Sequence, residues 1–188
     1  DIKTGAYLLT GQVKDVHSSG RAVCDFGQVT PGRLLTQWIH HLAYCAVVEL
    51  PGPTQLIGRD PDKRKPAVVF EFAPVKEQAG SLIEKLVRYF RLGSTRTLPF
   101  FCTPCFHLVK DLSKREYDLD DASLEKALSK AGALWSGNNF VAGEVQNRYT
   151  SLVFKDINPF ANLDTLRQSG ALDIGLSIFK PMLENMNT

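Results

Sequence analysis

The chain has 188 residues, of which 44% are hydrophobic and 22% are charged, a composition typical of an ordinary folded protein. Its 22 basic and 20 acidic side chains leave a net charge of +2, which excludes binding to nucleic acid through overall charge alone. No apolar run is long enough to span a bilayer, since the longest, residues 42–50, contains Glu49. At this length one domain can bury a sizeable core, and we expect a single domain over residues 1–188.

The first part of the chain predicts a β-hairpin followed by a helix. Apolar and polar residues alternate over residues 11–17, with Val13 and Val16 as the expected inward pair, and a turn signal at 18–20 precedes a second strand over 21–26. Thr30 before Pro31 is typical of a helix start. The apolar side chains of this helix recur at helical spacing and are Leu35, Trp38, Ile39, Leu42 and Ala46.

The middle of the chain predicts a second hairpin and a second helix. We expect strands over residues 54–58 and 67–72, joined by a charged turn. A helix should follow from about residue 74 and end before Gly93. The expected buried face of this helix consists of Ala79, Leu82, Ile83, Leu86 and Phe90.

The last part of the chain is predominantly helical in its pattern. Residues 97–110 are apolar and have no clear periodicity, so their aromatic side chains fit either a core or a partner surface. We expect a helix over residues 120–135 that ends before Gly137, a strand over 149–154, and two helical pieces over 163–186 divided near Gly170. The order of elements predicts an α/β (α+β) fold with a mixed sheet flanked by helices.

The four cysteines favour reduced thiols in a cytoplasmic protein. Cys102 and Cys105 have the CxxC spacing of some metal sites, but a second pair is missing. We therefore predict no metal and no cofactor. Because the sequence begins with Asp1 and not with Met, we expect a fragment or processed product of a larger protein.

One segment, residues 9–27, carries a pattern with chemical meaning. It resembles the nuclease domain of the RecB family in the PD-(D/E)XK superfamily, where a Gly-bounded strand turns into a strand that ends in Asp-Tyr-Lys. Lys14 falls at the first metal-binding aspartate of that family, Asp25 at the second, and Gly27 at the catalytic lysine. In the family, the two acids hold a divalent metal against the scissile phosphate, and the lysine positions the attacking water.

The departures at Lys14 and Gly27 imply a nuclease-like fold without catalysis. A lysine at the first position places a positive charge where the metal belongs, and glycine at the last position removes the group that aligns the nucleophile. Because such residues work as a unit, either loss should be severe. We therefore predict no catalytic residues and interpret Lys14, Asp25 and Gly27 as the positions of a vestigial site.

Further motifs, spread in order along the chain, resemble the C-terminal domain of the RecC (gamma) subunits of exodeoxyribonuclease V. They are the leucine-rich helix of residues 34–46 and the segments 97–101, 130–135, 142–144, 149–152 and 179–183. The resemblance implies a restriction-endonuclease-like core with a degenerate site, in a subunit of the RecBCD helicase–nuclease. It also implies a place near the DNA fork, contacts with RecB-like and RecD-like subunits and with double-stranded or forked DNA ends, and a cytoplasmic location.

A basic turn is the candidate DNA-binding site. Its cations are Arg59, Lys63, Arg64 and Lys65, diluted by Asp60 and Asp62. Four cations at a hairpin tip can contact phosphates, and the alternative is a solvated turn.

Two other functions stay open. One is an active metal-dependent DNA nuclease with a rearranged site built from Asp25, Glu71 and Glu144. The other is a protein-interaction module unrelated to DNA, which an exposed apolar patch over residues 97–108 would favour.

Overall fold

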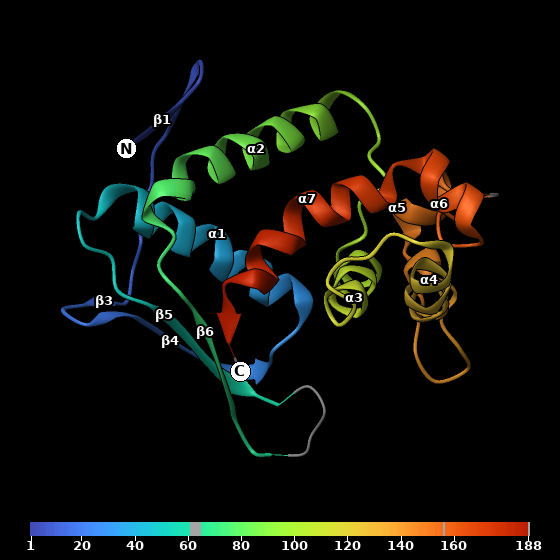
Figure 1. Ribbon diagram of the computed structural model, residues 1–188, viewed down its shortest axis with the longest axis horizontal. Coiled ribbons are helices and arrows are strands. Elements are labelled where there is room, and N and C mark those ends of the chain that lie inside the picture. The colour runs from blue at the N-terminus through green and yellow to red at the C-terminus, as the bar shows by residue number, and fades with distance from the viewer. Residues whose placement is uncertain (61–64, 156, 188) are drawn as a thin grey trace. The chain divides into compact units, whose positions relative to one another are not determined.

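The computed structural model describes residues 1–60, 65–155 and 157–187, and the chain divides into two compact units. Unit 1 comprises residues 1–92 and 184–188, and unit 2 comprises residues 93–183. Figure 1 shows a sheet with helices in unit 1 and a group of helices in unit 2. The single domain expected over residues 1–188 stays a prediction.

Unit 1 contains a five-stranded mixed sheet. Its strands, in spatial order, are β3 (Val16–His17), β4 (Gly20–Gln28), β5 (Thr54–Arg59), β6 (Val68–Phe72) and β7 (Met186–Asn187). Only β4 and β5 run parallel, which requires a crossover between them, and helix α1 (Pro31–Val47) provides it. The sheet and its helices confirm the expected mixed α/β class. A separate hairpin of β1 (Ile2–Thr4) and β2 (Tyr7–Leu9) precedes the sheet and was not expected.

Helix α1 begins where its cap predicts and packs on the sheet. The Thr30 hydroxyl accepts the N–H of Arg33 at 3.4 Å, and Trp38 is 1% exposed, so both expectations are confirmed. The buried stripe is displaced by one position from the expected one, because Leu35 is only half-buried and Ile39 is 42% exposed. The buried side chains are Leu34, Trp38, His41, Leu42, Tyr44 and Cys45. Leu56, Phe70 and Phe72 of the sheet are buried as well, and with these helix side chains they belong to the core of unit 1.

The first predicted hairpin is shorter than expected. β3 has two residues, and Asp15 before it has a φ of 62°, a conformation that interrupts an extended strand. Val16 is 45% exposed, so its expected inward orientation is wrong, while Val13 is half-buried. The turn at residues 18–20 and the second strand are confirmed.

Helix α2 (Lys76–Thr95) is longer and less buried than expected. It continues through Gly93 to Thr95, so the predicted end is wrong by three residues. Ala79 and Ile83 are buried as expected, but Phe90 is 78% exposed and does not belong to the core.

Unit 2 is helical in its described residues. Its elements are α3 (Cys102–Ser113), α4 (Asp121–Ser136), η1 (Glu144–Gln146), α5 (Arg148–Val153), α6 (Leu163–Ser169) and α7 (Ala171–Glu184). The expected strand over residues 149–154 is wrong, because the Asn147 side chain caps a helix there by accepting the N–H groups of Tyr149 and Thr150. The division at Gly170, with a φ of 78°, is confirmed.

The apolar segment of residues 97–110 belongs largely to the core of unit 2. Phe101 and Phe106 are 5% and 3% exposed, and Phe101 meets the Trp135 ring edge-on with centroids 4.6 Å apart. Phe100 stacks on Phe179. Helix α4 matches its prediction closely, with the Asp120 carboxylate accepting the Ser123 N–H at its start. No helix in the described residues is both long and apolar enough to cross a bilayer.

Candidate functional site

Strand β4 and the first turn of α1 bring three residues of unit 1 together: Asp25, Gly27 and Arg33. The crossover returns the chain over the strand it has just left, so position 33 lies against position 25. Arg33 Nη1 lies 2.5 Å from Asp25 Oδ1, and the Gly27 N–H donates to the same oxygen at 2.8 Å. Both side chains of the ion pair are partly exposed, Asp25 by 33% and Arg33 by 42%. The sequence reasoning identified positions 25 and 27 but missed the arginine.

The Arg33 guanidinium occupies the space next to Gly27. A Cβ atom at position 27 would lie 1.9 Å from Arg33 Nη1, far inside van der Waals contact. A side chain at this position would therefore require the Arg33 guanidinium to move from its present place.

Lys14, the third vestigial position, lies in the irregular segment before β3. Its backbone carbonyl accepts the Arg21 Nε–H at 2.9 Å. Arg21 is 3% exposed and also donates through Nη2 to Gln37 Oε1 at 2.7 Å. Burial lowers the pKa of Arg21, and the nearby charge of Asp15 opposes this shift.

Of the three acids that a rearranged nuclease site would need, Asp25 and Glu71 belong to unit 1, where they lie on opposite faces of the sheet, and Glu144 belongs to unit 2. Glu71 accepts a hydrogen bond from Gln55 Nε2 at 2.8 Å, and register places Gln55 opposite Ala22 of β4. Side chains alternate along a strand, so Glu71 shares a face with Ala22 and not with Asp25. Among the described residues, no group of three or more His, Cys, Asp or Glu side chains is placed to hold a metal ion.

The CxxC pair lies in the first turn of α3. Burial is the main cause that raises the pKa of Cys102 to about 11 and that of Cys105 to about 12. The thiolate is the form that binds metal, so the burial that raises these pKa values disfavours that form.

The basic turn is described only in part. Arg59 ends β5 and is exposed, and the Lys65 backbone N–H donates to Asp60 Oδ2 at 3.0 Å. Lys63 and Arg64 lie outside the described residues. DNA binding by this turn stays a prediction.

His41 of α1 is a fully buried polar residue. Its Nε2 lies 2.9 Å from the Ala73 carbonyl oxygen and its Nδ1 lies 2.9 Å from Thr54 Oγ1. A carbonyl only accepts, so Nε2 carries the proton and Nδ1 accepts from the Thr54 hydroxyl. The pKa of His41 is lowered to about 4. Burial is the main cause, the hydrogen bond to Ala73 opposes the shift, and the nearby charge of Arg21 adds to it.

This shift predicts a stability that falls in acid. In the unfolded state, His41 becomes protonated as the pH falls through its ordinary pKa of 6.5. In the folded state, it becomes protonated only when the pH falls to about 4. The free energy of unfolding should therefore fall by about 2 kcal/mol between pH 7 and pH 5 through this residue. Urea unfolding at a series of pH values measures the effect. His41→Gln should flatten the slope and exposed His17→Gln should not; an unchanged slope in His41→Gln would contradict the assignment.

Comparison with protein families shows a match over the first part of the chain. The family model for the RecC C-terminal domain matches residues 1–113, more than half of the chain. The matched region extends from β1 to the end of α3 and includes the Asp25–Gly27–Arg33 cluster. A search of curated proteins finds no match.

Proposed function

Because the chain belongs to the RecC C-terminal domain family, we propose that it is a non-catalytic, nuclease-like domain that acts at the DNA fork. Family membership links the chain to DNA repair of the RecBCD type. The finer parts of the proposal are a degenerate PD-(D/E)XK core, assembly with RecB-like and RecD-like subunits in an exodeoxyribonuclease V, and a cytoplasmic location.

The observation that carries the loss of catalysis is the guanidinium beside Asp25. A nuclease of this superfamily needs two carboxylates free to bind a divalent metal ion. Here Arg33 already pairs with Asp25 Oδ1 at 2.5 Å. Lys14 stands at the position of the other acid, so the two groups that should attract a cation are a neutralised carboxylate and a lysine. The positive charges of Arg33 and Lys14 repel a metal ion, which supports the proposal that this site binds none.

Position 27 supports the same conclusion for the attacking water. Glycine has no side chain to position a nucleophile, and the space that a lysine stem would need holds the Arg33 guanidinium. The substitution at 27 and the arginine at 33 therefore complement each other.

Contact with partner subunits is supported by exposed apolar side chains of unit 2. Phe140, Tyr149 and Leu152 are 96%, 78% and 74% exposed. Isolated apolar side chains are common on surfaces, but large ones at this exposure are enriched at interfaces. The apolar segment of residues 97–108, by contrast, is mainly core and is not the supporting feature.

A nuclease assay tests the proposal. The purified chain should not cleave single-stranded or forked DNA in Mg²⁺ or Mn²⁺, and Asp25→Ala should leave that result unchanged. Arg33→Ala should also remain inactive, because Lys14 and Gly27 still lack the required groups; exposed Arg88→Ala is its matched control. Cleavage that disappears in Asp25→Ala would show that a working site has survived.

A further inference from the structure

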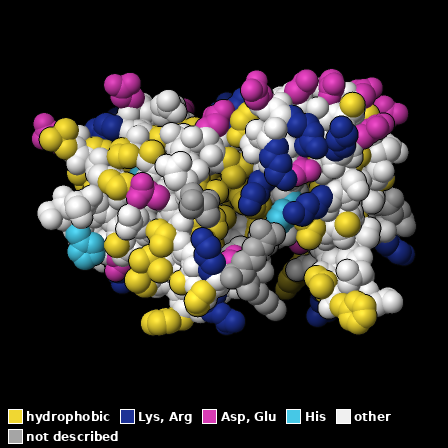
Figure 2. Space-filling view, turned by 60° about the horizontal axis from the view of Figure 1, so that its bottom comes forward, with side chains coloured by type: hydrophobic (Ala, Val, Ile, Leu, Met, Phe, Trp, Pro, Cys, Tyr) yellow, Lys and Arg dark blue, Asp and Glu magenta, His cyan; other side chains and the backbone are white. Residues whose placement is uncertain are grey.

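Helix α3 presents a row of basic side chains on its solvent face. Its inward face is buried through Cys105, Leu108 and Leu112, whereas Lys110 and Lys114, one turn apart, are exposed. Helix α4 packs against α3 and adds exposed Lys130. Figure 2 shows Lys and Arg side chains gathered on the right half of the view, apart from the acidic side chains along its upper edge. We define the α3–α4 basic surface as Lys110, Lys114, Arg115 and Lys130.

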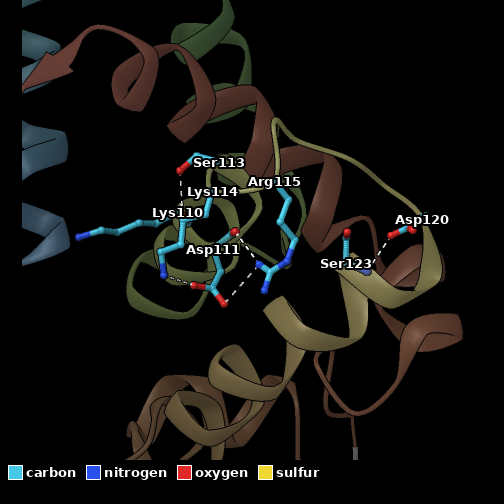
Figure 3. A network of polar contacts seen from close by, with 7 residues as sticks. All are labelled: Lys110, Asp111, Ser113, Lys114, Arg115, Asp120 and Ser123. Atoms are coloured by element: carbon cyan, nitrogen blue, oxygen red, sulfur yellow. Dashed lines mark hydrogen bonds and ion pairs between the residues drawn. The ribbon is translucent and has the colours of Figure 1, made fainter.

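The Asp111 carboxylate lies among these cations. Lys114 Nζ lies 2.5 Å from Asp111 Oδ1, and Arg115 Nη1 donates to the Asp111 backbone oxygen at 2.9 Å (Figure 3). The hydrogen bond from Lys114 lowers the pKa of Asp111 first, and the charges of Lys114, Arg115 and Lys130 lower it further. One negative charge therefore faces three positive charges, and the surface keeps a positive excess.

Lys110 adds a fourth cation, and no ion pair of its ammonium is found among the residues that the structure describes. Its side chain extends away from the Asp111 carboxylate in Figure 3, and its Nζ lies 5.7 Å from the Phe106 ring centroid. An ammonium over an aromatic face keeps its charge available to an anion on the other side.

The acids that follow α3 are engaged in local structure. Asp118 accepts the backbone N–H of Asp120 at 3.1 Å, and Asp120 caps α4 by accepting the Ser123 N–H at 2.7 Å (Figure 3). Asp121 pairs with Arg167 at 2.6 Å. These carboxylates are engaged at the start of α4. The bonds to Ser123 are the main cause that lowers the pKa of Asp120, and the charge of Arg115, one of the four cations, adds to it.

We propose that the α3–α4 basic surface binds the phosphodiester backbone of nucleic acid. Three of its four cations, Lys114, Arg115 and Lys130, lie beyond the residues that the family model matches. Lysines one helical turn apart have Cβ atoms about 5–6 Å from one another, a spacing at which each can contact a separate phosphate of one strand. The inference rests on the proposed DNA association and places it on unit 2, apart from the basic turn of unit 1.

The test compares the salt dependence of DNA binding. Lys110→Gln/Lys130→Gln removes two cations that do not bond to Asp111, so the Asp111 network stays intact. Fluorescence anisotropy with labelled single-stranded, duplex and forked DNA measures affinity over a salt series. In the variant, the slope of log K against log salt should shrink by about 1.4 on single strands and about 1.8 on duplex. Affinity at low salt should fall roughly tenfold or more.

Two controls make the result specific. Lys3→Gln/Arg88→Gln removes the same charge from unit 1 and should leave the slope unchanged, and Arg59→Gln/Lys65→Gln tests the basic turn. If the wild type binds DNA and only the basic-turn variant alters the slope, the inference is wrong but the DNA association stands. If the wild type binds none of the DNAs, both are wrong. Polyglutamate is added as a competitor at the same concentration of charge. If it displaces the DNA, the surface recognises acidic chains in general, and the proposal that it binds the phosphodiester backbone is wrong.

Discussion

Replacing Trp38 with alanine should lower the free energy of unfolding by about 3–5 kcal/mol. Trp38 is 1% exposed, and its ring lies 5.4 Å from the rings of both His41 and Phe72. It therefore packs α1 against β6 of the sheet through Phe72. Because a folded domain is stable by only about 5–15 kcal/mol, this loss would remove much of the stability of unit 1.

Urea unfolding followed by circular dichroism measures the effect, since removal of Trp38 also changes fluorescence. Ile39→Ala is the matched control: it lies next to Trp38 on the same helix, is 42% exposed, and should cost less than about 1 kcal/mol. Equal losses in the two variants would mean that α1 does not pack through Trp38. The candidate site depends on this packing, because α1 carries Arg33 and β4 carries Asp25.

The elements that sequence reasoning predicted well are those whose signals are local. The caps at Thr30 and Asp120 each accept an N–H three residues away, so residue type and spacing are sufficient to place the helix starts. The break between α6 and α7 depends on Gly170 alone, through its left-handed conformation.

The failures concern residues whose structure depends on distant parts of the chain. β7 has two residues, and its pairing with β6 joins Asn187 to Glu71 across more than a hundred residues of sequence. Residues 149–153 have the composition of a strand, but the Asn147 side chain caps a helix there, and none of the helix's residues is buried. Phe90 has the spacing of a core residue and yet lies on the exposed side of α2.

The candidate site shows the same division. The motif frame located Asp25 and Gly27, because both belong to one strand with a recognisable pattern. Arg33 was missed, since only the crossover from β4 to α1 brings its guanidinium back to the strand. The sequence did contain a signal. Arg33 lies in the first turn of a helix, where the helix dipole disfavours a positive charge, so a nearby acid is expected to compensate it.

Replacing Gly20 with alanine should destabilise unit 1 by about 3 kcal/mol or more. Gly20 has a φ of 140°, which residues with a side chain rarely adopt. A Cβ atom there would also lie 2.3 Å from the Pro53 carbonyl oxygen, and this neighbour is backbone that cannot rotate away. The same oxygen accepts the Arg21 N–H at 2.9 Å, so the clash falls where β4 and β5 begin their parallel pairing.

Gly80→Ala is the same chemical change, but it should raise the stability of the fold and not lower it. Gly80 lies within α2, and apart from its chain neighbours and the nearby backbone of α2 itself, no described atom is within 4 Å of the position that its Cβ would take. Alanine is favoured over glycine in a helix, so this variant should gain about 0.5–1 kcal/mol. Thermal unfolding of the two variants beside the wild type checks both signs at once. A Gly20→Ala variant as stable as the wild type would mean that the turn at residues 18–20 does not contact Pro53, and that the start of β4 is not fixed there. Asp25 and Gly27 lie on the same strand, so their place beside Arg33 depends on that start.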